Sequence, residues 1–145
     1  MKLLFKYRSP KEHYHADACV VWCIDLRFAE LLEKFLKKVG IRKSDVVKIA
    51  GGAKDIASPN DPRDRDYALR QIRTSVRLHG PQEIVVMSHQ DCGGYGGSIA
   101  FANDAEFERH THEDELQKAV SLLRNEFPHL KVRGAFADFD GVWEV

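Results

Sequence analysis

The chain has 145 residues, its 22 lysines and arginines balance its 22 aspartates and glutamates, and 43% of its residues are hydrophobic. This length suits one domain over residues 1–145 with its own core, and the balanced charge gives no reason to expect a nucleic acid or an anionic membrane as a partner. Three cysteines, an odd number, argue against a disulfide framework and favour metal binding or thiol chemistry.

The N-terminal stretch contains only three consecutive apolar residues before Lys6. That run is too short for the core of a signal peptide, and no later run is long enough to span a bilayer. We therefore expect a soluble, cytoplasmic protein.

Two strand and helix pairs are predicted in the first half of the chain. Residues 18–25 are a β-rich apolar run, and residues 27–40 carry apolar side chains at helical spacing and end in lysines and a glycine. A short second strand is predicted over residues 46–52. The charged residues 59–66 are typical of a loop, which leads into a helix over residues 67–80.

The second half continues the alternation. A third strand is predicted over residues 83–88, whose apolar centre is typical of a strand covered on both faces. Thr111 and Asp114 form a capping box for a helix that ends at Phe127, and two further strands are predicted over residues 131–139 and 142–145. These elements predict an α/β fold: a mainly parallel sheet of order 2-1-3-4, with a short fifth strand at the C-terminus, flanked by helices.

A metal site is one interpretation of the segment after the third strand, where His89 and Cys92 precede a run of glycines. The alternative is a glycine-rich turn beside a buried cysteine. If the first and third strands are neighbours, Cys23 at the end of the first strand comes close to both residues. Two thiolates and one imidazole are ligands that Zn²⁺ prefers, with a fourth position left for water or another side chain.

Asp25 and Arg27 follow Cys23 at alternate positions, so an extended backbone would carry all three side chains to one side. Asp25 can accept a hydrogen bond from water at the fourth position, or it can bind the metal itself and close the site. A bidentate pair with Arg27 would hold the carboxylate back from the metal.

Three segments in this order resemble the β-class carbonic anhydrases: CIDLR (23–27), AGG (50–52) and HQDCGG (89–94). The resemblance implies a β-carbonic-anhydrase-like domain with Zn²⁺ bound by Cys23, His89 and Cys92 and with Asp25 and Arg27 as a dyad beside it. It also implies reversible hydration of CO₂ to bicarbonate, with hydroxide on the metal as the nucleophile, in a homodimer or higher homo-oligomer.

The sequence departs from that family in two places. Lys48 and Ile49 stand where family members carry Arg-Asn, and only seventeen residues precede the first strand. Two alternatives therefore stay open: hydrolysis of COS or CS₂ on the same zinc site, and a zinc-binding module without activity that Asp25 closes. Phe28 and Tyr95 are candidates by position for an apolar CO₂ pocket, although ordinary packing explains an aromatic residue at either place.

Other residues that attract attention have plainer explanations. Cys19 is expected to be a small buried hydrophobe. The four histidines that form two His-x-His pairs are expected on the solvated surface, with a proton-shuttle role as the alternative: His13, His15, His110 and His112. Gly93 and Gly94 either offer backbone N–H groups to an anion such as bicarbonate or only form a turn.

Overall fold

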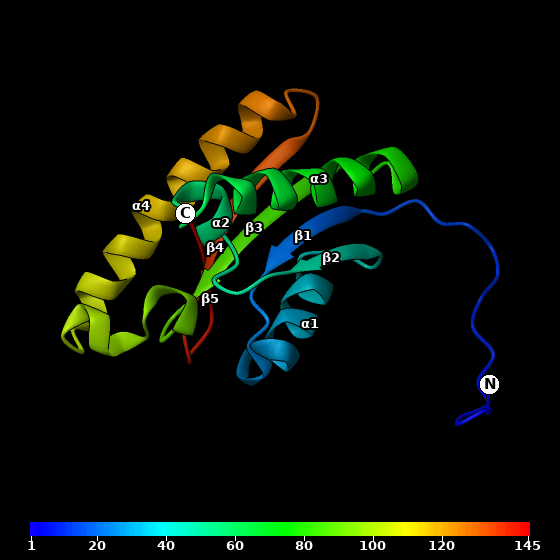
Figure 1. Ribbon diagram of the computed structural model, residues 1–145, viewed down its shortest axis with the longest axis horizontal. Coiled ribbons are helices and arrows are strands. Elements are labelled where there is room, and N and C mark those ends of the chain that lie inside the picture. The colour runs from blue at the N-terminus through cyan, green and yellow to red at the C-terminus, as the bar shows by residue number, and fades with distance from the viewer.

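A five-stranded sheet forms the centre of the protein in the computed structural model, which describes residues 1–145 (Figure 1). The strand order is β2-β1-β3-β4-β5; the first four strands are parallel, and β5 is antiparallel to β4. The strands are β1 (Ala18–Trp22), β2 (Ser44–Lys48), β3 (Glu83–His89), β4 (Lys131–Ala137) and β5 (Val142–Glu144). The predicted α/β fold and strand order are confirmed.

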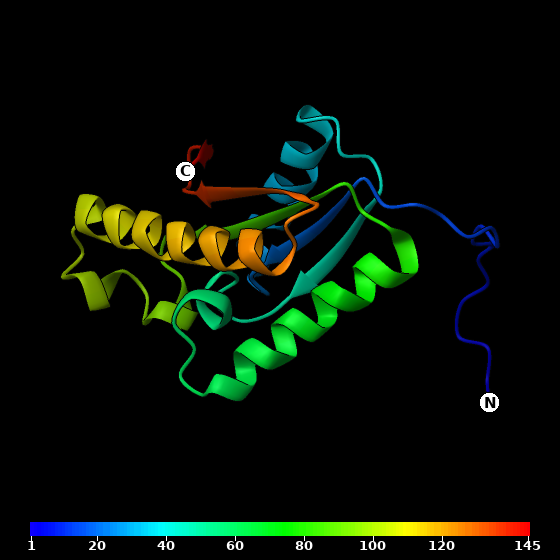
Figure 2. The ribbon, with the colours of Figure 1, turned by 90° about the horizontal axis from the view of Figure 1, so that it is seen from above.

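Helices cover both faces of this sheet. Figure 2 shows α1 on one face and α3 and α4 on the other. The α-helices are α1 (Ala29–Lys38), α2 (Lys54–Ala57), α3 (Pro62–His79) and α4 (Ala105–Glu126), and the 3₁₀ helices are η1 (Leu26–Phe28), η2 (Gly93–Tyr95) and η3 (Ser98–Phe101). No helix combines the length and the apolar composition that crossing a lipid bilayer requires.

Two hydrophobic cores lie on the two faces of the central strands. Because side chains alternate along a strand, Val86 of β3 packs into the core under α3 and α4, while its neighbour Val85 packs into the core under α1. Cys19 is fully buried in the first of these cores, as predicted, and burial raises the pKa of its thiol to about 11. Burial on both faces explains why β1 and β3 are continuous apolar runs.

The helix α3 begins earlier than predicted. Residues 59–66 were predicted to be a charged loop, but the helix already starts at Pro62, and the side chain of Asp61 caps it by accepting a hydrogen bond from the Arg63 N–H at 2.9 Å. Proline suits the first helical position because its fixed φ is helical and its missing N–H would have no partner there. The charged residues therefore belong to the cap and first turn of the helix, where Arg65 is half-buried and donates hydrogen bonds to the carbonyls of Ile56 and Ala57.

The start of α4 was also predicted too late. Asp104 is its N-cap and accepts hydrogen bonds from the N–H groups of Glu106 and Phe107, each at 3.0 Å. Thr111 lies inside the helix, where its hydroxyl donates to the carbonyl of Phe107, so the predicted capping box of Thr111 and Asp114 is wrong. The second strand, predicted to end at residue 52, ends at Lys48, and α2 follows it without having been predicted.

His112 does not lie on the surface, which corrects the prediction for this residue. The early start of α4 places it on the buried side of the helix, where its side chain is fully buried and its ring lies 4.4 Å from that of Tyr95 and 5.2 Å from that of Phe136. The other three histidines of the two pairs are exposed. Burial lowers the pKa of His112 to about 4, so the folded state holds it neutral.

Residues 1–15 form an extended arm that leaves the body of the protein, as both views show (Figures 1 and 2). Its last residues are anchored where Tyr14 donates a hydrogen bond to Asp45 at 2.5 Å and stacks on His79. This anchor lies near the first residues of β1, at the opposite end of the strand from Cys23.

We predict that His112 makes the protein sensitive to mild acid. The histidine has a pKa near 6.5 in the unfolded chain and about 4 in the folded one, so its contribution to stability is present above pH 6.5 and is lost as the pH falls toward 4. Between pH 7.5 and pH 5 this loss is about 2 kcal/mol. Urea denaturation should show the loss in wild type and not in His112→Leu.

The matched control is His110→Leu, which removes an exposed histidine two positions away on the same helix. It should keep the pH dependence of wild type. An equal loss of unfolding free energy in wild type and His112→Leu would show that His112 is not the acid-sensitive group.

Candidate metal centre

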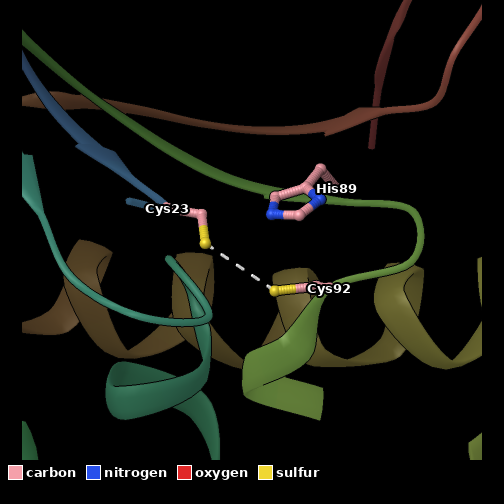
Figure 3. Close-up of side chains that lie close together, drawn as sticks. All are labelled: Cys23, His89 and Cys92. Carbon is pink, nitrogen blue, oxygen red and sulfur yellow. Dashed lines mark hydrogen bonds between the residues drawn. The ribbon is translucent and has the colours of Figure 1, made fainter. Parts of the chain in front are cut away.

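Three side chains of ligand type meet where β1 and β3 end (Figure 3). Cys23 directly follows β1, His89 is the last residue of β3, and Cys92 precedes η2. One ligand atom from each residue lies within 4.8 Å of the other two, and all three residues are buried. The structure therefore brings together the three residues predicted as metal ligands.

The geometry of the two sulfurs fits a metal ion. The Sγ atoms of Cys23 and Cys92 are 3.8 Å apart. Two sulfurs bound to Zn²⁺ at about 2.3 Å with a tetrahedral angle between them are separated by about 3.8 Å. The spacing thus needs no adjustment for zinc, and a disulfide, with sulfurs about 2 Å apart, would need the two thiols to approach each other.

The imidazole of His89 is prepared for the same role. Its Nδ1 donates a hydrogen bond to the carbonyl of Gln90 at 2.7 Å, so the neutral ring carries its proton on Nδ1 and a lone pair on Nε2. The Nε2 atom is buried and has no hydrogen-bond partner. A buried acceptor without a partner is costly, and a metal ion beside the sulfurs would satisfy it.

The thiols favour a cation between them. The pKa of Cys23 is lowered, first because the thiol of Cys92 donates a hydrogen bond to its thiolate and also because His89 lies beside it. The pKa of Cys92 is raised, first because its thiol donates a hydrogen bond to Cys23 and also because burial and the charge on Cys23 disfavour a second thiolate. A divalent cation would compensate both negative charges and allow both thiols to ionise.

Asp25 and Arg27 form a tight pair next to these residues. The Nε of Arg27 lies 3.1 Å from each carboxylate oxygen of Asp25, and its Nη2 lies 2.6 Å from Oδ2. These hydrogen bonds lower the pKa of Asp25 to about 2. The same Oδ2 is 3.9 Å from Nε2 of His89, so an ionised carboxylate lies at the edge of the three ligand-type side chains.

A turn brings Asp25 and Arg27 together. From the sequence, an extended strand was instead expected to carry both side chains to one side. The strand ends at Trp22, so strand alternation does not extend to Asp25 or Arg27. Asp25 instead caps η1 by accepting a hydrogen bond from the Arg27 N–H at 2.9 Å. The cap folds the two side chains toward each other.

Arg27 also pairs with a second carboxylate, which was not predicted from the sequence. Asp91, which lies between His89 and Cys92 in the chain, accepts a hydrogen bond from Nη1 of Arg27 at 2.8 Å. Behind it, Glu108 of α4 is only 1% exposed and accepts a hydrogen bond from the Asp91 N–H. The contact joins residues 64 positions apart, and only the place of Asp91 inside the HQDC segment could have drawn attention to it.

The glycines of the two loops at this end of the sheet allow their backbones to touch. A Cβ atom on Gly94 would lie 2.6 Å from Cα of Gly51 and 2.7 Å from its nitrogen, whereas one on Gly93 would meet nothing within 4 Å. The backbone of Gly94 is thus needed for packing of the AGG segment against the HQDCGG segment. Close backbone packing therefore explains the glycine at position 94 without a bound anion. Gly93 makes no such backbone contact.

The two aromatic candidates for an apolar pocket lie apart. The ring of Phe28 packs 4.6 Å from that of His89, and Tyr95 packs against His112 in the core. A surface cleft of about 600 Å³ opens beside Arg27 and Phe28, between α1 and the turn from β4 to β5. Of the two aromatic residues, only Phe28 borders both the cleft and the ligand-type side chains.

Comparison with known proteins agrees with this description. Residues 14–145 match the protein family described as "Putative carbonic anhydrase". An uncharacterized protein from Rickettsia bellii is 27% identical over 150 residues, which cover 99% of this chain and 92% of that protein. These matches extend over nearly the whole chain and are not confined to the three motifs.

Two solved structures are similar in fold. A tetrameric β-carbonic anhydrase from Sordaria macrospora is similar with a TM-score of 0.63 and 19% identity over 91% of this chain and 81% of that chain. A carbon disulfide hydrolase is similar with a TM-score of 0.55 and 19% identity over 90% of this chain and 79% of that chain. At these identities the similarity shows a shared fold.

We predict that Gly94→Ala separates the two loops. Its methyl group would overlap backbone atoms of Gly51, which cannot move aside like a flexible side chain. Overpacking of this kind costs about 1–3 kcal/mol. Thermal unfolding should show a lower Tm, and metal binding followed by calorimetry should be weaker. Gly93→Ala is the matched control and should leave both unchanged; equal effects of the two substitutions would contradict the role given to Gly94.

Proposed function

The chain belongs to the carbonic anhydrase family that its residues 14–145 match, and from that premise we propose that it catalyses the reversible hydration of CO₂ to bicarbonate with Zn²⁺ bound by Cys23, His89 and Cys92. The observation that supports this proposal best is the set of three buried ligand atoms within 4.8 Å, with the two sulfurs at the spacing that zinc requires.

Cys23, His89 and Cys92 would hold the metal, and a zinc ion with three protein ligands usually keeps a further position for water. When bound, Zn²⁺ acts as a Lewis acid that lowers the pKa of water and makes it nucleophilic near neutral pH. Two thiolates donate more charge to the ion than two imidazoles would, so a nearby acceptor for the proton of the attacking water becomes useful. Asp25 would be that acceptor, since its Oδ2 lies 3.9 Å from Nε2 of His89.

Asp25 orients the attacking water by accepting a hydrogen bond from it. Arg27 favours the ionised form of Asp25, because its hydrogen bonds lower the pKa of that carboxylate, and it holds the carboxylate oxygens in a fixed direction. The carboxylate can neither rotate freely nor take up a proton near neutral pH. Fixing the acceptor before the reaction removes an entropic cost from the reacting geometry.

The surroundings suit a small apolar substrate and a polar product. Phe28 is buried against His89 and presents an apolar surface beside the candidate metal position. The side chain of Arg27 is about half exposed at the cleft, and its charge is compensated by Asp25 and Asp91, so it forms a polar rim there. These two features are consistent with CO₂ entering and bicarbonate leaving on the same side.

Hydrolysis of CS₂ or COS is the second candidate function. It is supported by the similarity in fold to a carbon disulfide hydrolase, and the same ligands and dyad would serve both reactions. A zinc-binding module closed by Asp25 is the third. The bidentate pair with Arg27 disfavours closure, because binding of Asp25 to the metal would break charge-assisted hydrogen bonds.

We also propose that the protein is a homodimer or a larger homo-oligomer. Ile24 and Leu26 flank Asp25 and are 61% and 84% exposed, which leaves apolar side chains in water next to the site. A second copy of the chain would cover them. The tetrameric β-carbonic anhydrase of similar fold is consistent with such an assembly.

We predict that the zinc-loaded protein hydrates CO₂ in a stopped-flow assay and that Cys23→Ser, Cys92→Ser and His89→Ala each lose most of the zinc and the activity. Each variant removes one of three ligands, and partial sites bind zinc much more weakly. Zinc content measured by atomic emission should be about one per chain in wild type.

Cys19→Ser is the matched control, because it alters a cysteine in the core away from the candidate site, and it should keep zinc and activity. Full zinc occupancy in Cys92→Ser would contradict the ligand assignment. Sulfide release from CS₂ or COS by a wild-type protein that does not hydrate CO₂ would favour the second function, and failure in all assays with zinc retained would favour the closed module.

A further inference from the structure

Arg27 is held between two carboxylates, and the proposed function uses only one of them. All three of its guanidinium nitrogens donate hydrogen bonds: Nε and Nη2 to Asp25, Nη1 to Oδ2 of Asp91 at 2.8 Å, and Nη2 also to the Asp91 carbonyl at 2.9 Å. The guanidinium is planar and rigid, so gripping both of its edges fixes its orientation. Asp91 therefore determines where Arg27 presents its other edge to Asp25.

The backbone of Asp91 is itself held in a conformation that an L-residue seldom adopts. Its φ is 53°, in the left-handed region, which is tolerated by aspartate but needs support from the surrounding structure. Glu108 provides that support by accepting hydrogen bonds from the Asp91 N–H at 2.6 Å and from the Ser98 hydroxyl at 2.7 Å. The Ser98 N–H donates to Oδ1 of Asp91 at 2.9 Å and orients its side chain.

These contacts connect a buried anchor to an exposed pair. Glu108 is 1% exposed and lies in the first turns of α4, whereas the side chain of Arg27 is 46% exposed. An exposed ion pair alone holds its partners weakly. Here Asp91 links Arg27 to the core. Its Oδ1 accepts a hydrogen bond from the Ser98 N–H, and its Oδ2 accepts one from the guanidinium of Arg27.

Asp91 also lies in the loop that carries two of the three ligand-type side chains, between His89 and Cys92. The same loop therefore fixes both the metal position and the group that restrains Asp25. Without the hydrogen bonds to Asp91, the guanidinium of Arg27, whose side chain is about half exposed, would be free to turn, and its fork toward Asp25 would loosen. Asp25 could then leave its pair with Arg27 and reach the metal.

We propose that Asp91 is a positioning residue that, through Arg27, keeps the carboxylate of Asp25 away from the fourth metal position. The proposal rests on the proposed function, because it assigns the metal to Cys23, His89 and Cys92. It concerns the access of small ligands to the metal, which can be measured whether or not the protein turns over CO₂.

The test uses Co²⁺ in place of zinc, because its visible spectrum reports the ligands around it. Thiocyanate is titrated into the Co²⁺-loaded full chain of wild type, Asp91→Asn, Asp25→Asn and the double variant. In Asp91→Asn the amide keeps the shape of the side chain but loses the charge that grips Arg27. We expect thiocyanate to bind at least about tenfold more weakly to Asp91→Asn, the scale of losing one hydrogen bond to a charged group.

Asp25→Asn in the Asp91→Asn background should restore thiocyanate affinity, since the amide is a poor ligand for the metal and no longer competes with the anion. A merely structural role of Asp91 would not be rescued in this way. Asp66→Asn is the matched control: it removes the charge of an exposed aspartate on α3 whose side chain has no hydrogen bond and which does not line the cleft, and it should bind thiocyanate like wild type.

Equal thiocyanate affinities in wild type and Asp91→Asn would overturn the proposal, and so would a loss of affinity that the double variant does not reverse. Retained Co²⁺ content and an unchanged Tm show that Asp91→Asn is folded. If Asp91→Asn proves unstable, Ser98→Ala, which leaves the charge of Asp91 in place but removes a hydroxyl from Glu108, should weaken thiocyanate binding in the same direction. If wild type binds Co²⁺ and thiocyanate but does not hydrate CO₂, the proposed function fails while the positioning role stands.

Discussion

The parallel pairing of β1 with β3 is the constraint on which the site depends. The two strands are in register from Ala18 opposite Glu83 to Val21 opposite Val86, so their C-terminal ends reach the same edge of the sheet. Cys23 and Cys92, 69 positions apart in the chain, come within 3.8 Å of each other there. The crossover that makes this pairing also places β2 on the other side of β1, as open α/β sheets do at a switch point.

The loops at the C-terminal ends of these strands are held by close backbone contact and by a buried polar network. Gly94 lets its loop lie against Gly51 without a side chain between them. Glu108 and Asp91 then join that loop to α4 and to Arg27. The site is thus rigid for two separate reasons, one steric and one electrostatic, and each can be altered by a substitution that leaves the other in place.

Sequence patterns predicted the sheet well because they depend on local apolar runs and on the general rules of parallel sheets. They also indicated the group of Cys23, His89 and Cys92, since ligand-type residues stood at the ends of strands that the topology makes neighbours. The starts of α3 and α4 were missed because charged residues around Pro62 and Asp104 resemble loops unless the cap is recognised.

The remaining errors concern contacts that local patterns cannot show. His112 has polar neighbours in sequence and was expected in solvent, yet the early start of α4 turns it into the core. The grip of Asp91 on Arg27 depends on a left-handed backbone at Asp91 and on Glu108 behind it. Both depend on how α4 packs against the sheet, and the sequence alone carries no signal for that register.

The most direct test of the metal centre is X-ray absorption at the zinc edge of the purified full chain. Two sulfur scatterers at about 2.3 Å, one imidazole nitrogen at about 2.0–2.1 Å and one further light atom are the expected result. The same measurement on Cys92→Ser should lose one sulfur. A shell of four sulfurs, or one without sulfur, would contradict the assignment of zinc to Cys23, His89 and Cys92.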